Sequence, residues 1–264
     1  MTVKFTILGC GSSGGVPRIG NDWGACDPTN PKNRRRRCSL MLEQTAPEGS
    51  TRVIIDTSPD MREQMLSAQV SAIDGIWYTH EHADHTHGID ELRVFYLHQR
   101  QRIPIWADTP TAELLMHRFA YCFISPQGSN YPPIVEHRLI VPGTEISTQG
   151  QGGALASLPF KVHHGNIDAL GFRIGNVAYT PDLNGVPDAS LACLQGLDIW
   201  IIDALRQRPH PSHFSLSETL DWITRLKPKQ AIITNMHIDL DYETLCNELP
   251  SNVTPAYDGL NFEA

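Results

Sequence analysis

The stretch "THEHADHTHG", from Thr79 to Gly88, crowds four histidines and two acids into ten positions, directly after the apolar run at 76–78. In an extended segment successive side chains alternate between two faces, so every second residue projects to one side until the chain bends. Imidazoles and a carboxylate are ligands that zinc, manganese and iron accept. A solvated loop after a strand would explain the polarity but not this order. The spacing therefore predicts that two adjacent metal ions share His80, His82, Asp84 and His85.

Short apolar, β-branched runs recur along the chain and alternate with segments of helical period, which predicts an α/β protein with many strands. Nearly every cluster of polar residues follows the end of such a run. "PFKV" leads to His163 and His164, "NVAYT" to Asp182, "DIWIID" to Asp203, and "QAIIT" to Asn235 and His237. Because α/β scaffolds gather strand ends along one rim, we expect these side chains to converge on one site.

The length of 264 residues suits one large domain, since the two candidate linkers, 125–133 and 149–153, are short and strand-like runs resume after each. No segment approaches the roughly 20 apolar residues that cross a bilayer, and the N-terminus lacks the form of a secretory signal. Six scattered cysteines without a C-x-x-C pair predict free thiols. We therefore expect a single, soluble, cytoplasmic domain over residues 1–264.

The formal net charge of −8 disfavours a general nucleic-acid binder, because phosphate backbones reward a basic surface. One basic run, from Arg34 to Arg37, departs from this balance. A solvated basic face is the favoured interpretation of the run, and a phosphate clamp is the alternative.

The motif after the strand, a later His before Gly, a later Asp after a strand and a late His together resemble the metallo-β-lactamase superfamily. The resemblance covers essentially the whole chain and implies an α/β fold, the four-layer αββα sandwich, as a single hydrolase domain. The opening "LGCGSSGGVPRIG" and the later "RRRRCS" are similar to one branch of that superfamily. This branch contains the phosphoribosyl 1,2-cyclic phosphate phosphodiesterase of the carbon-phosphorus lyase pathway, and it lies close to the ribonuclease Z type phosphodiesterases.

The resemblance assigns a role to each candidate ligand and implies two divalent metal ions, Zn or Mn, as cofactors. It gives one ion to His80, His82 and His164, the other to Asp84, His85 and His237, and makes Asp182 the bridge between them. In "VHHG" the position before Gly matches the family, so His164 is the expected ligand and His163 should point to the opposite face.

Two departures from the family pattern stand out. The branch commonly reads Thr-His at the late ligand, whereas this chain reads "ITNMHIDLDY", with Asn235 in place of that His. We expect His237, two residues on and on the same face of an extended segment, to supply the imidazole. The relative also carries a cysteine cluster for a structural zinc, of which this chain keeps Cys26 alone, so we expect no structural zinc.

The segment "PHPSHFSLSETLDWITRL" bears on the chemistry. Ser215 and Glu218 form a capping box before a helical pattern, so His213 should lie just ahead of a helix N-terminus, where an anion such as phosphate is favoured. His213 is therefore the expected general acid and phosphate-binding residue. An ordinary capping-region histidine is the alternative, and His210 is the rival candidate for the role.

The sequence also suggests roles for Asp84, Asp56 and the glycine-rich opening. Asp84 is expected to aim the attacking hydroxide as well as to bind metal, although ligation alone is nearly as good an account. Asp56, which ends "RVIID", is expected to orient the ligand loop rather than to bind metal. The glycines of "GCGSSGG" are expected to let the backbone approach the site, because no Gly-Lys-Ser/Thr follows to make a phosphate loop.

Together these observations predict a metal-dependent hydrolase, a phosphodiesterase that cleaves a small cyclic or nucleotide-like phosphate ester with a metal-bridging hydroxide. An RNA-processing nuclease of the ribonuclease Z type and a thioester or lactone hydrolase on the same fold are the alternatives. The expected partner is a small-molecule phosphate ester or nucleotide. A membrane partner is not expected, nucleic acid is not favoured, and a homodimer is allowed.

Overall fold

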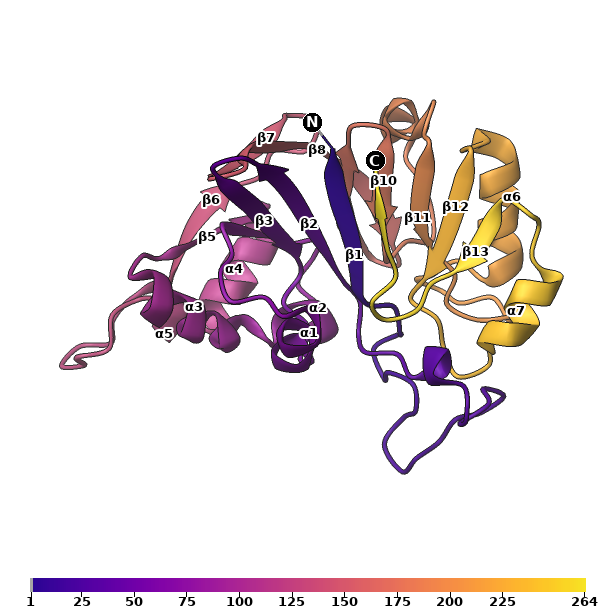
Figure 1. The fold of residues 1–264 in the computed structure, drawn as a ribbon, viewed down its shortest axis with the longest axis horizontal. Coiled ribbons are helices and arrows are strands. Elements are labelled where there is room, and N and C mark those ends of the chain that lie inside the picture. Colours follow the sequence, from indigo (N-terminus) through magenta and orange to yellow (C-terminus); the bar gives the residue numbers. More distant parts are fainter. Residues whose placement is uncertain (1) are drawn as a thin grey trace.

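Two seven-stranded sheets face each other at the centre of the molecule (Figure 1). The structure is a computed structural model that describes residues 2–264. The first sheet has the strand order β14 (Asn261–Glu263), β1 (Val3–Gly9), β2 (Ser39–Ala46), β3 (Gly49–Ile55), β4 (Gly75–Trp77), β5 (Ile103–Ala107) and β6 (Val135–Leu139). The second has the order β13 (Val253–Pro255), β12 (Gln230–Thr234), β11 (Ile199–Asp203), β10 (Val177–Thr180), β9 (Ile167–Ile174), β8 (Gly153–His164) and β7 (Ile146–Gly150).

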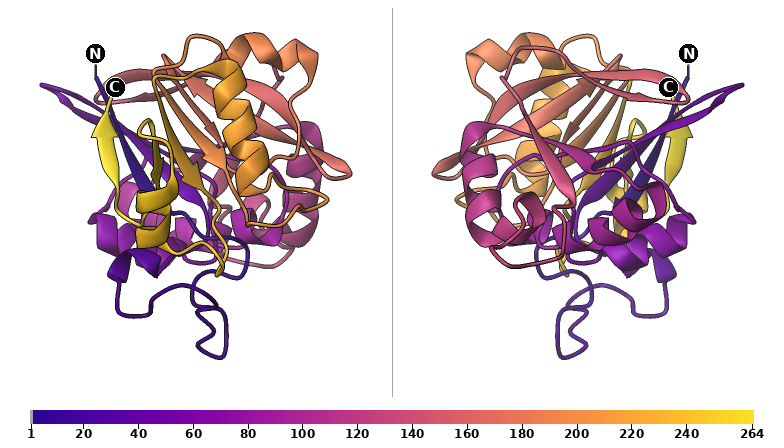
Figure 2. Two further views of the ribbon diagram at one scale, coloured as in Figure 1. Left: turned by 90° about the vertical axis from the view of Figure 1, so that its right-hand side faces the viewer. Right: turned by 90° about the vertical axis from the view of Figure 1, so that its left-hand side faces the viewer.

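Helices cover the outer faces of both sheets. The first sheet is flanked by α1 (Met61–Ala68), α3 (Leu92–Gln99), α4 (Thr109–Arg118) and α5 (Ala120–Phe123), whereas α6 (Leu216–Leu226) and α7 (Tyr242–Glu248) lie against the second. One side view in Figure 2 has α6 and α7 in front of the second sheet. The short α2 (Ala83–Thr86) and the 3-10 turns η1 (Pro31–Asn33), η2 (Ile89–Glu91) and η3 (Asp188–Leu194) belong to connections. The predicted α/β class and four-layer αββα sandwich are confirmed.

The alternation of side chains along the strands explains the layering. In β3, Val53 and Ile55 point into the core between the sheets, while Ile54 between them points outward, toward the helices. The inner core also contains Trp77 of β4 and Phe172 of β9, whose rings stack across the sheets with centroids 5.6 Å apart. Apolar residues on both faces of the first sheet therefore require a cover on each side.

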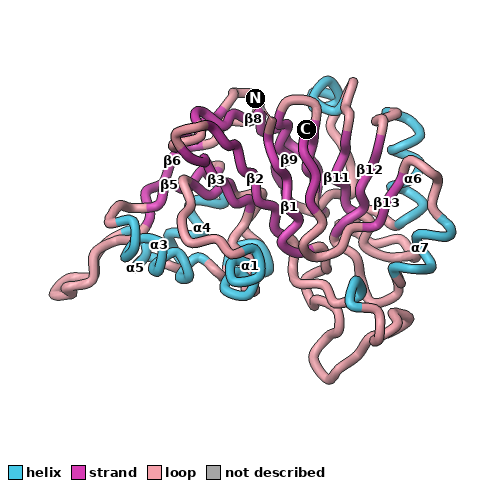
Figure 3. Tube along the Cα trace, in the orientation of Figure 1, coloured by secondary structure: helices cyan, strands magenta, loops and turns pink. Residues whose placement is uncertain are grey.

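The polar residues that follow the strands gather at one edge. Strands β10, β11 and β12 are parallel, and β8 runs in the same direction as β10 because both are antiparallel to β9. Their carboxyl ends therefore share an edge, where Figure 3 shows loops beyond both sheets. The long connection 10–38 projects from this edge (Figure 1). The convergence predicted from the sequence is thus built into the strand directions.

No helix in the described part of the chain has both the length and the apolar character to cross a membrane.

Candidate metal centre

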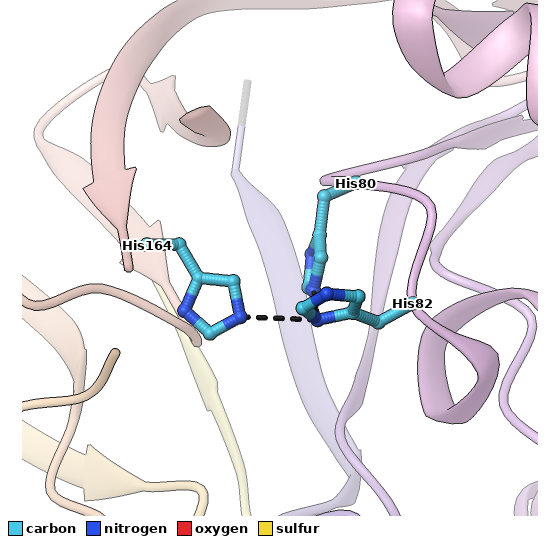
Figure 4. Close-up of side chains that lie close together, drawn as sticks. All are labelled: His80, His82 and His164. Carbon is cyan, nitrogen blue, oxygen red and sulfur yellow. Dashed lines mark hydrogen bonds between the residues drawn. The ribbon is translucent and has the colours of Figure 1, made fainter. Parts of the chain in front are cut away.

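Three imidazoles meet at the shared edge of the sheets (Figure 4). His80 and His82 lie in the loop after β4, and His164 is the last residue of β8. The Nδ1 atom of His82 lies 3.0 Å from Nε2 of His80 and 3.1 Å from Nε2 of His164. Three ring nitrogens that converge this closely fit a shared cation.

The surroundings keep two of these rings neutral, which is the state that binds metal. Burial lowers the pKa of His80 well below its ordinary value and lowers that of His164 too. The Nδ1–H of His164 donates to the carbonyl oxygen of Ser212 at 2.7 Å, which leaves the Nε2 lone pair directed at the cluster.

A second group lies beside the first and contains His85, Asp84 and Asp182. The Nε2 atom of His85 lies 3.3 Å from Oδ1 of Asp182 and 3.6 Å from Oδ2 of Asp84. His85 Nε2 and Asp182 Oδ1 are both buried, and neither makes a well-formed hydrogen bond within residues 2–264. Buried polar atoms without partners are costly, so these two atoms fit a bound cation.

Asp182 lies between the two groups. Its Oδ2 atom is 3.8 Å from Nε2 of His80 and 3.7 Å from Nε2 of His164, while its Oδ1 faces His85. Burial works against the charged carboxylate, but the surrounding imidazoles, His85 above all, bring the pKa of Asp182 well below its usual range. An ionised carboxylate in this position has one oxygen for each group.

Asp56 orients the ligand loop, as the sequence predicted. Its Oδ2 accepts a hydrogen bond from Nδ1 of His85 at 2.7 Å, and its carboxylate also accepts from the N–H and hydroxyl of Thr79 at 2.8 Å each. The backbone of Asp56 has φ of 66°, in the left-handed region that Asp tolerates better than most residues. The turn after β3 thereby directs this carboxylate at the ring nitrogen opposite the cluster.

His213 lies at the border of the cluster and is held by Asp203, a residue to which the sequence pattern assigned no role. Its Nδ1–H donates to Oδ2 of the buried Asp203 at 2.8 Å, and its ring centroid lies 4.6 Å from that of His164. Asp203 also accepts from the backbone N–H of Leu183 at 3.1 Å. The sequence feature that could have pointed to Asp203 is its place at the end of a buried apolar run, "DIWIID".

The charges of this pair follow from burial and proximity. Burial raises the pKa of Asp203 to about 7. Burial works against a charged His213, yet the Asp203 and Asp182 carboxylates outweigh it and raise the pKa of His213 to about 9. His213 also approaches Asp182 at 3.9 Å, but it does so through the same Nδ1 that Asp203 engages. The Asp203 carboxylate engages that nitrogen, while His164, Asp182 and His213 together form a third convergent group. The Nε2 atom of His213 is left for other partners.

The capping box beyond His213 is present as predicted. Ser215 caps α6, its hydroxyl accepts from the N–H of Glu218 at 3.4 Å, and the Glu218 carboxylate accepts from the N–H of Ser215 at 2.8 Å. His163 is exposed and pairs with Asp168 at 3.2 Å, so it points away from the cluster, as alternation predicted.

Asn235 and His237, the two candidates for the late ligand, make different contacts. Asn235 is buried, has φ of 60°, and its amide donates to Oδ1 of Asp203 at 3.2 Å. The Nδ1–H of His237 donates to Asp239 at 2.9 Å, and its Nε2 is in contact with the guanidinium of Arg18. None of the three convergent ligand groups within residues 2–264 includes His237. His237 does line one small cavity with Asp84 and His213.

The basic run from Arg34 to Arg37 was expected to be a solvated face, and this expectation is wrong for three of its residues. Only Arg34 is exposed. Arg35 is 2% exposed and donates to Asn33 at 3.2 Å. Arg36 pairs with Asp258 at 2.9 Å and Arg37 with Asp60 at 3.1 Å. A Cβ atom on Gly9 would lie 2.1 Å from the carbonyl oxygen of Arg37, so the glycine-rich opening lets this segment pack closely.

The comparison with known families decides the identity of this fold. The model of the beta-lactamase superfamily domain matches residues 51–238, which include the predicted ligands from His80 to His237. The chain belongs to the metallo-β-lactamase superfamily. It is accordingly a hydrolase whose fold implies divalent metal ions, and the convergent His and Asp side chains around Asp182 are the candidate sites for them.

Solved structures of the same fold match the whole length of this chain. A diphosphatase from the PhnP family is 37% identical, with a TM-score of 0.89 over 100% of this chain and 98% of that one. Zn²⁺-bound PqqB from Methylobacterium extorquens has a TM-score of 0.75 at 17% identity, covering 99% of each chain. Human short-form tRNase Z has a TM-score of 0.64 at 17% identity, and the match covers 98% of each chain. The resemblance drawn from the sequence is confirmed, and the last two likenesses concern the fold.

One curated relative of similar sequence is named as a transferase. The octanoyltransferase of Porphyromonas gingivalis strain ATCC BAA-308 / W83 is 29% identical over 263 residues. The match covers 98% of this chain and 51% of the relative, so the superfamily member spans about half the length of that protein.

Proposed function

We propose that this hydrolase is a phosphodiesterase that uses two divalent metal ions, Zn or Mn, to cleave a small cyclic or nucleotide-like phosphate ester. The observation that carries the proposal is the His213–Asp203 pair at the border of the ligand cluster. A histidine held by a buried carboxylate suits an ester whose leaving oxygen needs a proton. The 37% identity to a diphosphatase of the PhnP family supports phosphorus as the reacting centre.

The residues divide between the two ions as follows. His80, His82 and His164 would hold one ion, Asp84 and His85 the other, and Asp182 would bridge them. We assign the remaining ligand to His237, whose imidazole lines the same cavity as Asp84. Its Nε2 would exchange the Arg18 contact for the ion, and the Asn235 amide is engaged with Asp203. Divalent ions at these positions would lower the pKa of a water molecule and neutralise phosphoryl oxygens.

The chain's own side chains supply the remaining steps. Asp84 borders the cavity, and its side chain is 17% exposed, so its carboxylate can accept a hydrogen bond from the attacking water and orient it. His213 keeps Nδ1–H on Asp203 and donates the proton of Nε2 to the leaving oxygen. Asp203 fixes the ring orientation and stabilises the charged imidazole before the proton is given up.

A substrate panel tests the proposal. Protein loaded with Zn²⁺ or Mn²⁺ is assayed on 2′,3′-cyclic nucleotides, bis(p-nitrophenyl) phosphate, p-nitrophenyl phosphate and an octanoyl thioester, each with and without chelator. We expect the highest kcat/KM on a diester and its loss with chelator. A higher kcat/KM on the thioester would contradict the proposal and favour the thioester hydrolase.

Processing of an RNA precursor is the other alternative. The net charge of −8 argues against it, and so does the engagement of Arg35, Arg36 and Arg37 in contacts with the protein itself. A precursor tRNA is added to the same panel, and endonucleolytic cleavage faster than diester hydrolysis would favour the ribonuclease Z type activity.

A further inference from the structure

Asp203, the residue that holds His213, has different partners on its two carboxylate oxygens. Its Oδ2 accepts hydrogen bonds from Nδ1–H of His213 at 2.8 Å and from the backbone N–H of Leu183 at 3.1 Å. Its Oδ1 has one donor within residues 2–264, the side-chain amide of Asn235 at 3.2 Å. Because Asp203 is fully buried, an oxygen without a donor would be costly there. Asn235 is therefore the group that satisfies the second oxygen.

The chemistry of its neighbours fixes which way round the Asn235 amide lies. Its nitrogen is 3.2 Å from Oδ1 of Asp203 and 3.1 Å from Nδ1 of His213. Its oxygen faces the thiol of the buried Cys38, which donates to Oδ1 over 3.9 Å. A rotated amide would place its oxygen against the carboxylate, and both of those groups are acceptors. The amide nitrogen thus lies beside the ring nitrogen of His213, and both direct an N–H at the same carboxylate.

The backbone on both sides of Asn235 is held by neighbouring segments. The carbonyl oxygen of Thr234, the last residue of β12, accepts from the N–H of Ala204 at 3.0 Å. The N–H of Met236 donates to the carbonyl oxygen of Cys10 at 2.8 Å. Between these bonds Asn235 takes φ of 60°, a left-handed backbone that Asn and Gly adopt more readily than other residues. The amide is therefore presented from a fixed and buried segment.

We propose that Asn235 is a positioning residue for the general acid: its amide holds the Asp203 carboxylate so that His213 keeps Nδ1–H on Asp203 and directs Nε2 at the leaving oxygen. This inference rests on the proposed function, in which His213 gives a proton to that oxygen. An imidazole can carry its proton on either nitrogen, and the partner of one nitrogen decides the state of the other. Asn235 restrains that partner through its second oxygen, so its effect on the reaction passes through His213.

Two esters that share a nucleotide and differ in their leaving group test the assignment. Thymidine 5′-(methyl phosphate) can release only an alkoxide, whereas thymidine 5′-(p-nitrophenyl phosphate) releases nitrophenolate without a proton. The Asn235→Gly variant removes the amide and tolerates the left-handed backbone. In Zn²⁺-loaded protein we expect its kcat on the methyl ester to fall about 10-fold or more, because a hydrogen bond to a charged group is lost. The fall on the p-nitrophenyl ester should be much smaller, and KM should change little for either ester.

The His213→Ala background is the control. Because Asn235 acts through His213, Asn235→Gly added to His213→Ala should cause no further loss on the methyl ester. A further loss as large as in the wild-type background would overturn the inference, and so would equal effects of Asn235→Gly on the two esters. A leaving-group dependence in His213→Ala alone would leave the proposed function standing without the inference. Loss of a metal ion in Asn235→Gly would also overturn it, because Asn235 would then be a ligand.

If the wild type hydrolyses neither ester, the proposed function fails, and NMR then tests the positioning by itself. In Zn²⁺-loaded protein labelled with ¹⁵N-histidine, the Nδ1–H signal of His213 is the one that is missing from His213→Ala. Its hydrogen bond to the buried Asp203 should protect this proton from exchange with water. Exchange about 10-fold faster in Asn235→Gly would support the positioning role. Equal exchange rates in the variant and the wild type would overturn it.

Discussion

At the scale of the residue, the His213 assignment makes the sharpest statement about chemistry. His213→Ala should retain both metal ions, because its Nδ1 is bonded to Asp203 and its role is to give a proton. On a diester with an alkoxide leaving group the rate should fall by about 10²- to 10⁴-fold. On a p-nitrophenyl ester the loss should be much smaller, because that oxygen leaves without a proton.

His210 provides the comparison for this experiment, since it is the rival candidate and lines the same cavity. His210→Ala should reduce the two rates equally if at all. Equal losses on both esters in His213→Ala would reduce its role to phosphate binding, and unchanged rates on both would leave it an ordinary histidine of the capping region.

The late ligand is a second question at this scale. We expect His237→Ala to lose one metal ion per chain and Asn235→Ala to keep both, because the Asn235 amide donates to Asp203. The left-handed backbone of Asn235, with φ of 60°, is one that Asn adopts more readily than most residues. Inductively coupled plasma mass spectrometry on protein dialysed against buffered Zn²⁺ measures the content. The opposite pattern would move the ligand to Asn235.

Single residues also define the limit of what the sequence can predict. The H-x-H spacing was enough to place His80 and His82 together, although they lie in the loop after β4. Alternation along β8 was enough to separate His163 from His164, because it depends only on neighbours. The Asp203–His213 bond and the Arg18–His237 contact are formed between separate segments, the latter across 219 positions, so no local pattern encodes them.

At the scale of the element, connection 10–38 depends on polar contacts with the start of α7. The Asp241 carboxylate caps that helix and also accepts from the N–H of Asp27 at 3.1 Å and from the Asn33 amide at 2.6 Å. Cys26 packs beneath it, with its thiol 3.4 Å from the carbonyl oxygen of Ile238. These partners lie more than 200 positions apart, so the arginine run and the lone cysteine were harder to interpret from sequence than the strands.

The same contacts give a pH dependence. Partial burial would raise the pKa of Asp241, but the N–H groups of Thr244 and Asp27 and the Asn33 amide outweigh it and lower this pKa to about 2. A carboxyl whose pKa is lower in the folded state than in the unfolded state, where it is about 3.9, stabilises the fold above pH 4. This contribution is lost as the pH falls toward 2.

Asp241→Ala should therefore cost about 1 kcal/mol of unfolding free energy at pH 7, the usual value of an N-cap, and less as the pH falls below 4. Urea denaturation of both proteins in chelator at pH 3, 4 and 7 measures the difference. Glu243→Gln, at an exposed position of the same helix, is the control. A difference that stays constant over this pH range would show that the carboxylate charge contributes nothing.

At the scale of the whole molecule, the site depends on how the two sheets meet. The four motif residues follow β4 in the first sheet, whereas His164 ends β8 and Asp182 follows β10 in the second. Apolar runs predicted the strands, and the rule that strand ends share an edge predicted the convergence. The sequence pattern alone did not specify that the ligands come from two facing sheets, because that follows from packing; the family resemblance supplied it.

Because ligands from both sheets surround the cluster, bound cations should link the sheets and raise the melting temperature. A ligand that binds only the folded state stabilises it by about 2.7 kcal/mol at 100 times its Kd, which corresponds to roughly 5–10 °C for a chain of this size. Differential scanning calorimetry with saturating Zn²⁺ and with chelator should show a shift of this order in the wild type. His164→Ala should lose most of the shift, while the adjacent His163→Ala should keep it, since His163 is turned toward Asp168. An equal shift in the two variants would mean that the cations bind outside the cluster formed by His80, His82 and His164.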